Sequence, residues 1–249
     1  MKRTLNAKGK SCLVIGDLHI PFQHPDSFKF LAAIKKKYLN KNSLIFSIGD
    51  EVDGNQISMH DKDPDILLSP SSELEKCIEI IHMKGGLHEL FPKMRILSSN
   101  HGDLVYRRAK KGGLPLHYLR ELKDVYQTKQ WSWHDEIMLS TRNGSIYLCH
   151  GRSSSSGKLV GGLGDIYGTV QGHYHGKHSI TWYNGGSKNR FCAYTGCLID
   201  EKNLAFNYGR LSVTKPILGS LLIQDDFNAT PLLLTMTLDK NNRWDGKLP

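Results

Sequence analysis

The stretch "NSLIFSIGDEVD" (residues 42–53) passes from an apolar run directly into Gly-Asp and two further acids. A short apolar run bounded by polar residues is typical of a strand that is buried on both faces. Two other stretches have the same form, namely "SCLVIGDLH" (11–19) and "MRILSSNHGD" (94–103). Each predicted strand therefore ends in groups that bind cations or move protons.

The segments between these strands have the pattern of helices. Apolar side chains recur at helical spacing, with lysines on the other face, at Phe28, Leu31, Ile34 and Tyr38. Ser72 and Glu75 match a capping box and predict a helix through "ELEKCIEIIHM" (73–83). Strands that alternate with helices predict a largely parallel sheet with crossover helices.

After about residue 130 the pattern changes to β-strands. Asn143-Gly144 lies between two strand-like runs in residues 131–151, which predicts a hairpin. Residues 169–200 indicate further strands around a Gly-Gly turn, and residues 215–238 indicate a final hairpin. No linker or repeat separates the α/β half from the β half, so we expect one domain, 1–249, with a shared core.

The composition is that of a basic globular protein. The chain has 249 residues, 39% of them hydrophobic and 23% charged, which is enough for a sizeable core. Its formal charge of +9 favours polyanionic partners such as nucleic acid, although a generally basic surface gives the same excess. No apolar run approaches the roughly 20 residues of a membrane span, so no membrane partner is expected. The basic N-terminus precedes a strand-like run that soon meets a charge, and we interpret it as part of the fold rather than as a signal peptide.

The cysteine pattern favours a reducing, cytoplasmic compartment. The count is odd, the spacing is scattered and there is no C-x-x-C among Cys12, Cys77, Cys149, Cys192 and Cys197. Cys192 and Cys197 could form half of a zinc site, but no second pair completes it. We therefore expect buried thiols.

Polar residues follow the predicted strands in both halves. The carboxyl ends of parallel strands meet at one edge of a sheet, so these side chains should converge: Asp17, His19, Asp50, Asn100 and His101. The second half adds His150, His173 and His175, each after a β-type run. His173 and His175 would point to the same side of an extended segment, as metal-binding imidazoles do, although such a pair alone also fits a solvated surface strand.

The donor set predicts a metal centre. Oxygen and nitrogen donors without thiolates suit Mn²⁺, Fe, Zn²⁺ or Ni²⁺. Their number exceeds the needs of one ion, and a bridging carboxylate can hold two ions roughly 3.5–4 Å apart. Asp50 is the expected bridge because its strand is central in the predicted order.

In this order the motifs "DLH", "GDEVD", "SNHGD", "CHG" and "GHYH", between residues 17 and 175, resemble those of the calcineurin-like metallophosphoesterase superfamily. The resemblance implies an α/β fold, a four-layer α/β/β/α sandwich with a dinuclear metal site at the strand ends. One ion, by the resemblance Mn²⁺ or a similar divalent cation, would bind to Asp17, His19, Asp50 and His175. The other would bind to Asp50, Asn100, His150 and His173.

The resemblance gives His101 a catalytic role rather than a ligand role. It would protonate the leaving oxygen or stabilise the transferring phosphoryl group, and a carboxylate would orient its ring. Asp53 is one candidate for that carboxylate. Asp103 is another, but Gly102 separates it from His101, whereas the acid of the family pattern follows the histidine directly. Ser99 is a second departure, since the family pattern has glycine there.

The implied reaction is hydrolysis of a phosphoester by in-line attack of a metal-bound hydroxide. "GDEVDG" is similar to the protein Ser/Thr phosphatase branch, but Gly54 and Ser98-Ser99 replace the arginines that grip phosphate there. That branch is therefore not expected.

A basic cluster beside Tyr106 favours a nucleic-acid substrate, DNA or RNA. Its members, the predicted substrate-binding residues, are Arg107, Arg108, Lys110 and Lys111. Trp131 and Trp133 either stack on bases or pack in the core. The hypothesis is a nuclease or phosphodiesterase similar to the DNA-repair exonuclease branch.

Several alternatives stay open at this point. The basic cluster also fits a solvated helix face. A phosphomonoesterase acting on nucleotides or other small phosphorylated molecules is the second candidate, and a catalytically silent binding protein of the same fold is the third. The Gly- and Ser-rich stretch 151–165 is either a lid near the substrate or a surface connection.

Overall fold

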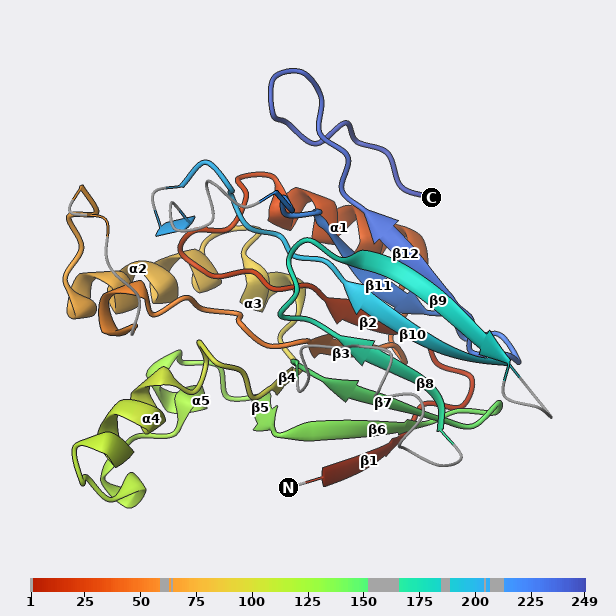
Figure 1. The fold of residues 1–249 in the computed structure, drawn as a ribbon, viewed down its shortest axis with the longest axis horizontal. Helices are drawn as coiled ribbons and strands as arrows, with labels where there is room; N and C mark the ends of the chain where they lie inside the picture. The colour runs from red at the N-terminus through yellow and green to blue at the C-terminus, as the bar shows by residue number, and fades with distance from the viewer. Residues whose placement is uncertain are drawn as a thin grey trace.

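Two six-stranded mixed sheets lie face to face in the computed structural model (Figure 1). It describes residues 2–58, 63, 65–151, 166–184, 189–203, 205–206 and 213–249. We call the sheet with the order β12-β11-β2-β3-β4-β5 the β2 sheet, and the sheet with the order β1-β6-β7-β8-β10-β9 the β7 sheet. The described strands are β1 (Lys2–Asn6), β2 (Cys12–Ile15), β3 (Leu44–Ser47), β4 (Met94–Leu97), β5 (Trp131–His134), β6 (Glu136–Ser140), β7 (Ser145–Cys149), β8 (Ile166–Gln171), β9 (His178–Asn184), β10 (Asn189–Thr195), β11 (Gly219–Ile223) and β12 (Pro231–Thr235).

Helices pack on the outer face of the β2 sheet. The described helices are α1 (Ser27–Tyr38), α2 (Pro70–His82), α3 (Leu87–Leu90), α4 (Leu104–Lys111) and α5 (Leu122–Val125), with the 3₁₀ turns η1 (Asn55–Ile57) and η2 (Leu116–Tyr118). The described part of the chain thus shows the α/β/β layers of the expected α/β sandwich. Figure 1 shows α4 and α5 projecting sideways from the sheets.

The alternation of side chains along β2 explains the layers. Leu13 and Ile15 pack with the helices, whereas Cys12 and Val14 pack against the β7 sheet. Both faces of the strand are therefore buried, which is why its sequence is apolar without alternation. β2, β3 and β4 are parallel neighbours, as predicted, and β5, which was expected to belong to the β half, is a further parallel strand beside β4.

Both predicted hairpins are confirmed. β6 pairs antiparallel with β7 around Asn143-Gly144, and β11 pairs antiparallel with β12. The predicted Gly-Gly turn, at residues 185 and 186, lies outside the described residues. β1 was not predicted, and it extends the β7 sheet by pairing parallel with β6.

The predicted start of α2 was wrong. The N-cap is Ser69, whose Oγ accepts from the backbone N–H of Ser72, while Ser72 Oγ accepts in return from the Ser69 N–H at 2.8 Å. The helix therefore begins at Pro70, because proline fits the first turn, where its missing N–H has no partner to lose.

Several composition-based expectations can be compared with the structure. All five cysteines belong to the described residues and are buried thiols with no disulfide. Trp131 is 2% exposed within the core and Trp133 packs against it, so the packing interpretation of the two tryptophans is confirmed. Across the described residues, no helix has the length and apolar character needed to cross a bilayer.

The C-terminal segment around Arg243 and Trp244 is hydrogen-bonded to Asp26, at the start of α1. Asp26 is buried and its carboxylate accepts from Nε and Nη2 of Arg243, both at 2.5 Å, and from the backbone N–H of Trp244 at 3.1 Å. The Trp244 ring packs edge-on against Phe30. In Figure 1 this segment loops over α1. The Arg243 side chain holds the pKa of Asp26 well below its ordinary value.

We expect Arg243→Met to lower the thermal unfolding midpoint at pH 7. Because the folded-state pKa of Asp26 is depressed, this stabilisation is fully present above about pH 4, the ordinary carboxyl pKa, and is lost as the pH falls further. The difference in midpoint between the two proteins should therefore shrink below about pH 4. Lys240→Met, an exposed change in the same segment, is the control. A difference that stays constant with pH would contradict this account.

Candidate metal centre

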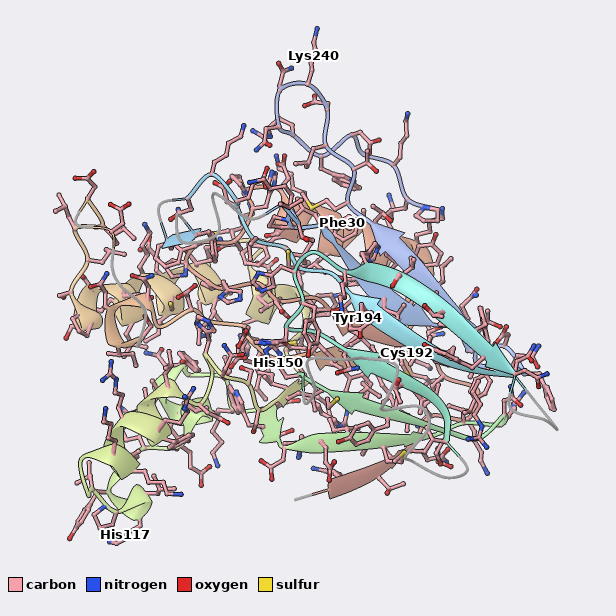
Figure 2. All side chains as sticks on the ribbon, viewed as in Figure 1. Phe30, His117, His150, Cys192, Tyr194 and Lys240 are labelled. Carbon is pink, nitrogen blue, oxygen red and sulfur yellow. The ribbon has the colours of Figure 1, made fainter. Side chains whose placement is uncertain are left out.

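The carboxyl ends of strands from both sheets meet at one place. Residues after β2, β3 and β4 of the β2 sheet face residues after β7 and β8 of the β7 sheet, and Figure 2 shows His150 at this meeting point near the centre of the molecule. The structure brings together all the residues predicted as ligands, namely Asp17, His19, Asp50, Asn100, His150, His173 and His175.

These side chains form two groups that share Asp50. In the first group, donor atoms of Asp17, His19, Asp50 and His175 lie within 4.8 Å of one another. His19 Nε2 is 3.2 Å from His175 Nε2, and His175 Nε2 is 3.3 Å from Asp17 Oδ2. The division into groups is the one that the family resemblance implies.

The second group lies on the other side of Asp50. His150 Nε2 is 3.1 Å from Asp50 Oδ2 and 2.9 Å from Asn100 Oδ1. His173 Nδ1 is 3.0 Å from the same amide oxygen. His150 and His173 lie edge-on, with ring centroids 5.2 Å apart.

His150 directs one ring nitrogen toward the oxygens of the second group. Its Nδ1 donates to the carbonyl of Ile48 at 3.0 Å, which leaves Nε2 facing Asp50 and Asn100. Burial lowers the pKa of His150, but Asp50 and Asp17 outweigh this effect and raise it to about 9, so without a metal ion Nε2 carries the proton that these oxygens accept. A divalent cation would take the place of that proton between the same atoms.

Asp17 gives a second indication. Its Oδ1 is fully buried and has no hydrogen-bond partner among the described residues. A buried carboxylate oxygen without a donor is costly unless a cation satisfies it. The residues present therefore fit one or two divalent ions, and the oxygen and imidazole donors suit the harder transition metals.

Several of these residues have unusual backbone conformations. His19, Asp50 and His173 have φ values of 51°, 47° and 69°, in the left-handed region that non-glycine residues seldom adopt. Such conformations cost about 1–3 kcal/mol each and persist where the surroundings enforce them. The Asp50 carbonyl accepts from the backbone N–H groups of Leu18 and His19, which fixes two of these turns against each other.

Gly49 is required by the packing of His150. Its φ is +111°, and a Cβ there would lie 2.6 Å from His150 Nδ1 and 2.7 Å from Ser99 Cβ. This close approach explains why glycine precedes Asp50.

His101 is oriented by Asp53. His101 Nδ1 donates to the Asp53 carbonyl at 2.7 Å, and the carboxylate oxygen Oδ1 lies 3.5 Å away. Burial lowers the pKa of His101, but the carboxylates of Asp53 and Asp50 raise it to about 9, so the ring can carry a proton at neutral pH. The Asp53 carboxylate also contacts His19 Nδ1 at 2.9 Å. Burial opposes its ionisation, but the two histidines lower its pKa to about 2.

Asp103, the second candidate to orient His101, does not pair with the His101 ring. It is the N-cap residue of α4, and within the described residues no hydrogen bond or ion pair joins its carboxylate to His101. Burial and the nearby Asp135 raise the pKa of Asp103. Of the two carboxylates proposed to orient His101, the structure places only Asp53 beside it.

The four basic residues of α4 have different surroundings. Arg107 Nη1 donates to the Asn100 carbonyl at 3.3 Å, which places it beside the centre. Arg108 donates to the carbonyls of Ile57 and Ser58, so its guanidinium fastens α4 to η1. Lys110 and Lys111 are exposed in the last turn of α4.

Two contributors to the site had no predicted role. Ser99 Oγ accepts from the N–H groups of Asp50, at 2.9 Å, and Gly102, at 3.0 Å, and so joins the two ligand-bearing turns. Its only signal in the sequence is the departure from glycine. Glu51 is buried beneath the same turn, accepts from Trp133 Nε1 at 2.8 Å, and has its pKa raised to about 7 by burial. No pattern marked it, because it follows Asp50 as one acid in an acidic run.

Of the predicted Gly- and Ser-rich loop, residues 152–165 lie outside the described residues.

Comparison with solved structures returned phosphoesterases. A predicted phosphoesterase from Streptococcus pneumoniae TIGR4 is 10% identical, with 96% of this chain and 95% of that chain covered and a TM-score of 0.41. An archaeal phosphodiesterase is 12% identical (90% and 99% covered, TM-score 0.44), and a provisionally assigned diadenosine tetraphosphatase is 14% identical (98% and 99% covered, TM-score 0.44).

Neither a protein-family model nor a curated protein sequence matches the chain. At such low identity and TM-score, these likenesses do not establish the reaction of this chain.

We expect Gly49→Ala to weaken Mn²⁺ binding at least about tenfold, because the added methyl group displaces His150 and Ser99. The affinity can be measured by isothermal titration calorimetry. Gly85→Ala is the matched control, since Gly85 has a φ of +75° but no atom within 4 Å of its hypothetical Cβ. It should cost about 1 kcal/mol of stability from backbone strain and leave Mn²⁺ affinity unchanged. Equal loss of affinity in both variants would rule out the packing explanation.

Proposed function

We propose that this chain is a metal-dependent phosphoester hydrolase with a dinuclear centre, most suitably filled by Mn²⁺, with Fe, Zn²⁺ and Ni²⁺ as alternatives. The main support is the Asp50 carboxylate, which is shared by two groups of donor side chains while His101, a ring able to carry a proton, lies beside it. Two divalent ions bound there would neutralise phosphate charge and acidify a water molecule.

The residues of the site have distinct roles in this proposal. Asp17, His19, Asp50 and His175 would hold one ion, and Asp50, Asn100, His150 and His173 the other. His101 gives its Nε2 proton to the leaving oxygen, because its Nδ1 is already committed to Asp53. Arg107, beside Asn100, donates to a phosphate oxygen at the mouth of the centre.

For the substrate we propose a phosphodiester of nucleic acid, DNA or RNA. The formal charge of +9 and the cations of α4 support a polyanion. A phosphomonoesterase acting on nucleotides is the second candidate, since Arg108 is occupied by the carbonyls of η1 and fewer cations remain for a long backbone. A silent binding protein is disfavoured, because every donor position of the centre is filled.

Two further proposals concern the chain as a whole. The buried thiols support a reducing, cytoplasmic environment. Strands from both halves of the chain enter both sheets, which supports a single domain over residues 1–249.

A substrate panel with the Mn²⁺-loaded protein tests the reaction. The panel contains linear DNA, RNA, cyclic nucleotides and nucleoside monophosphates. We expect cleavage of DNA or RNA. Cleavage of monophosphates alone would favour the second candidate, and no cleavage of any ester would favour the binding protein.

Asp50→Asn should remove metal binding and hydrolysis together. The amide has lost the negative charge that both groups of donors share, so neither ion is held well. Metal content by elemental analysis and hydrolysis of bis(4-nitrophenyl) phosphate are the two measurements. Full metal content with no hydrolysis would show that Asp50 is not the bridge.

His101→Ala should keep the metal and lower kcat by about 10²–10⁴-fold on substrates with a poor leaving group. The loss should be smaller for bis(4-nitrophenyl) phosphate, because 4-nitrophenolate departs without a proton. If both substrates lose the same factor, His101 stabilises the phosphoryl group rather than protonating the leaving oxygen.

A further inference from the structure

An apolar cavity of about 440 Å³ lies between α2, α4 and α5, next to the candidate metal centre. Its wall includes aliphatic side chains from each of these helices, among them Leu74, Val105 and Leu122. The rings of Tyr106, Tyr118 and Tyr126 also line it. His101 belongs to this wall as well.

His101 therefore has one surface toward the cavity and one toward the metal centre. Its ring lies edge-on to His19, with centroids 4.6 Å apart, and its backbone N–H donates to Asp50 Oδ1 at 3.1 Å. A group that protonates the leaving oxygen must contact that oxygen. A leaving group in contact with His101 would therefore lie close to the cavity, whose wall includes this residue.

Glu73, an acidic residue in the cavity wall, already accepts hydrogen bonds from the backbone. Both carboxylate oxygens of Glu73 accept backbone N–H groups, from Asn55 at 2.7 Å and from Gln56 at 2.8 Å. Arg120 is exposed and donates to the Asp124 carbonyl at 3.0 Å. The interior thus offers apolar and aromatic surface, which favours a flat, uncharged ring system and disfavours a second phosphate.

We propose that this cavity binds the first nucleoside of the leaving group of the phosphodiester, with its base against the tyrosine rings. This inference rests on the proposed hydrolase function. Helix α4 carries both parts of the required surface, because Val105 and Tyr106 line the cavity while Arg107 lies beside the centre. Base stacking on aromatic rings is tolerant of base identity, so purine and pyrimidine nucleosides should both bind.

Binding of free nucleosides tests the cavity without any requirement for catalysis. Adenosine and uridine would be titrated into the Mn²⁺-loaded protein and followed by calorimetry. Val105→Trp fills the cavity and should weaken binding by about tenfold or more. Leu114→Trp is the matched control, because Leu114 is 45% exposed, close to the 42% of Val105, but does not line the cavity. Tyr118→Ala, at a residue 70% exposed, removes one ring without disturbing the core and should also weaken binding.

Hydrolysis supplies the second measurement. Two diesters of one nucleotide are compared, one with a nucleoside leaving group and one with methanol as the leaving group. The ratio of their kcat/KM values should favour the nucleoside ester in the wild type and fall in Val105→Trp but not in Leu114→Trp.

The outcomes separate the two proposals. If nucleosides bind and Val105→Trp abolishes binding while no ester is hydrolysed, the cavity assignment stands and the hydrolase proposal fails. If esters are hydrolysed but neither nucleoside binds, the cavity assignment is overturned. Equal weakening by Val105→Trp and Leu114→Trp would also overturn it.

Discussion

Asp50 connects the parts of the site to one another. Its N–H donates to Ser99, its carbonyl accepts from Leu18 and His19, and its carboxylate accepts from the His101 N–H and faces His150. One residue thus joins the turns after β2, β3 and β4 and the histidine that follows β7. The position of the central strand in the β2 sheet makes this possible, because only the residue after β3 has ligand-bearing turns on both sides.

The arrangement is costly in the absence of cations. An Asp17 oxygen has no hydrogen-bond donor among the described residues, and three ligand residues keep left-handed backbones. Each feature opposes folding by itself, and each becomes favourable or tolerable when positive charge occupies the centre. Unfavourable features gathered at one place in a fold are typical of functional sites rather than of a structural core.

The meeting of the strand ends could be predicted, because the convergence of parallel strands is a geometric rule that needs no side-chain detail. The division of the residues into two ligand groups came from the family resemblance. His150 and His173 could be added since each follows a β-type run. The choice between Asp53 and Asp103 could not be made in this way. It depends on how the turn of residues 99–103 lies relative to η1. That position is set by contacts between residues distant in the sequence, such as Arg108 with Ile57.

The role of Ser99 could not be predicted for a similar reason, because a hydroxyl that accepts two backbone N–H groups has no characteristic spacing in the sequence. The start of α2 was misplaced because three serines within residues 69–72 offer several caps of similar chemistry.

The pairing of β11 with β2 has a consequence for biosynthesis. β2 is synthesised before its antiparallel neighbour β11, which begins only at Gly219. During translation one edge of β2 therefore lacks its partner while apolar strands accumulate beside it, and unpaired edges of this kind recruit other chains. Shielding of that edge until β11 has emerged would keep it from pairing with other chains.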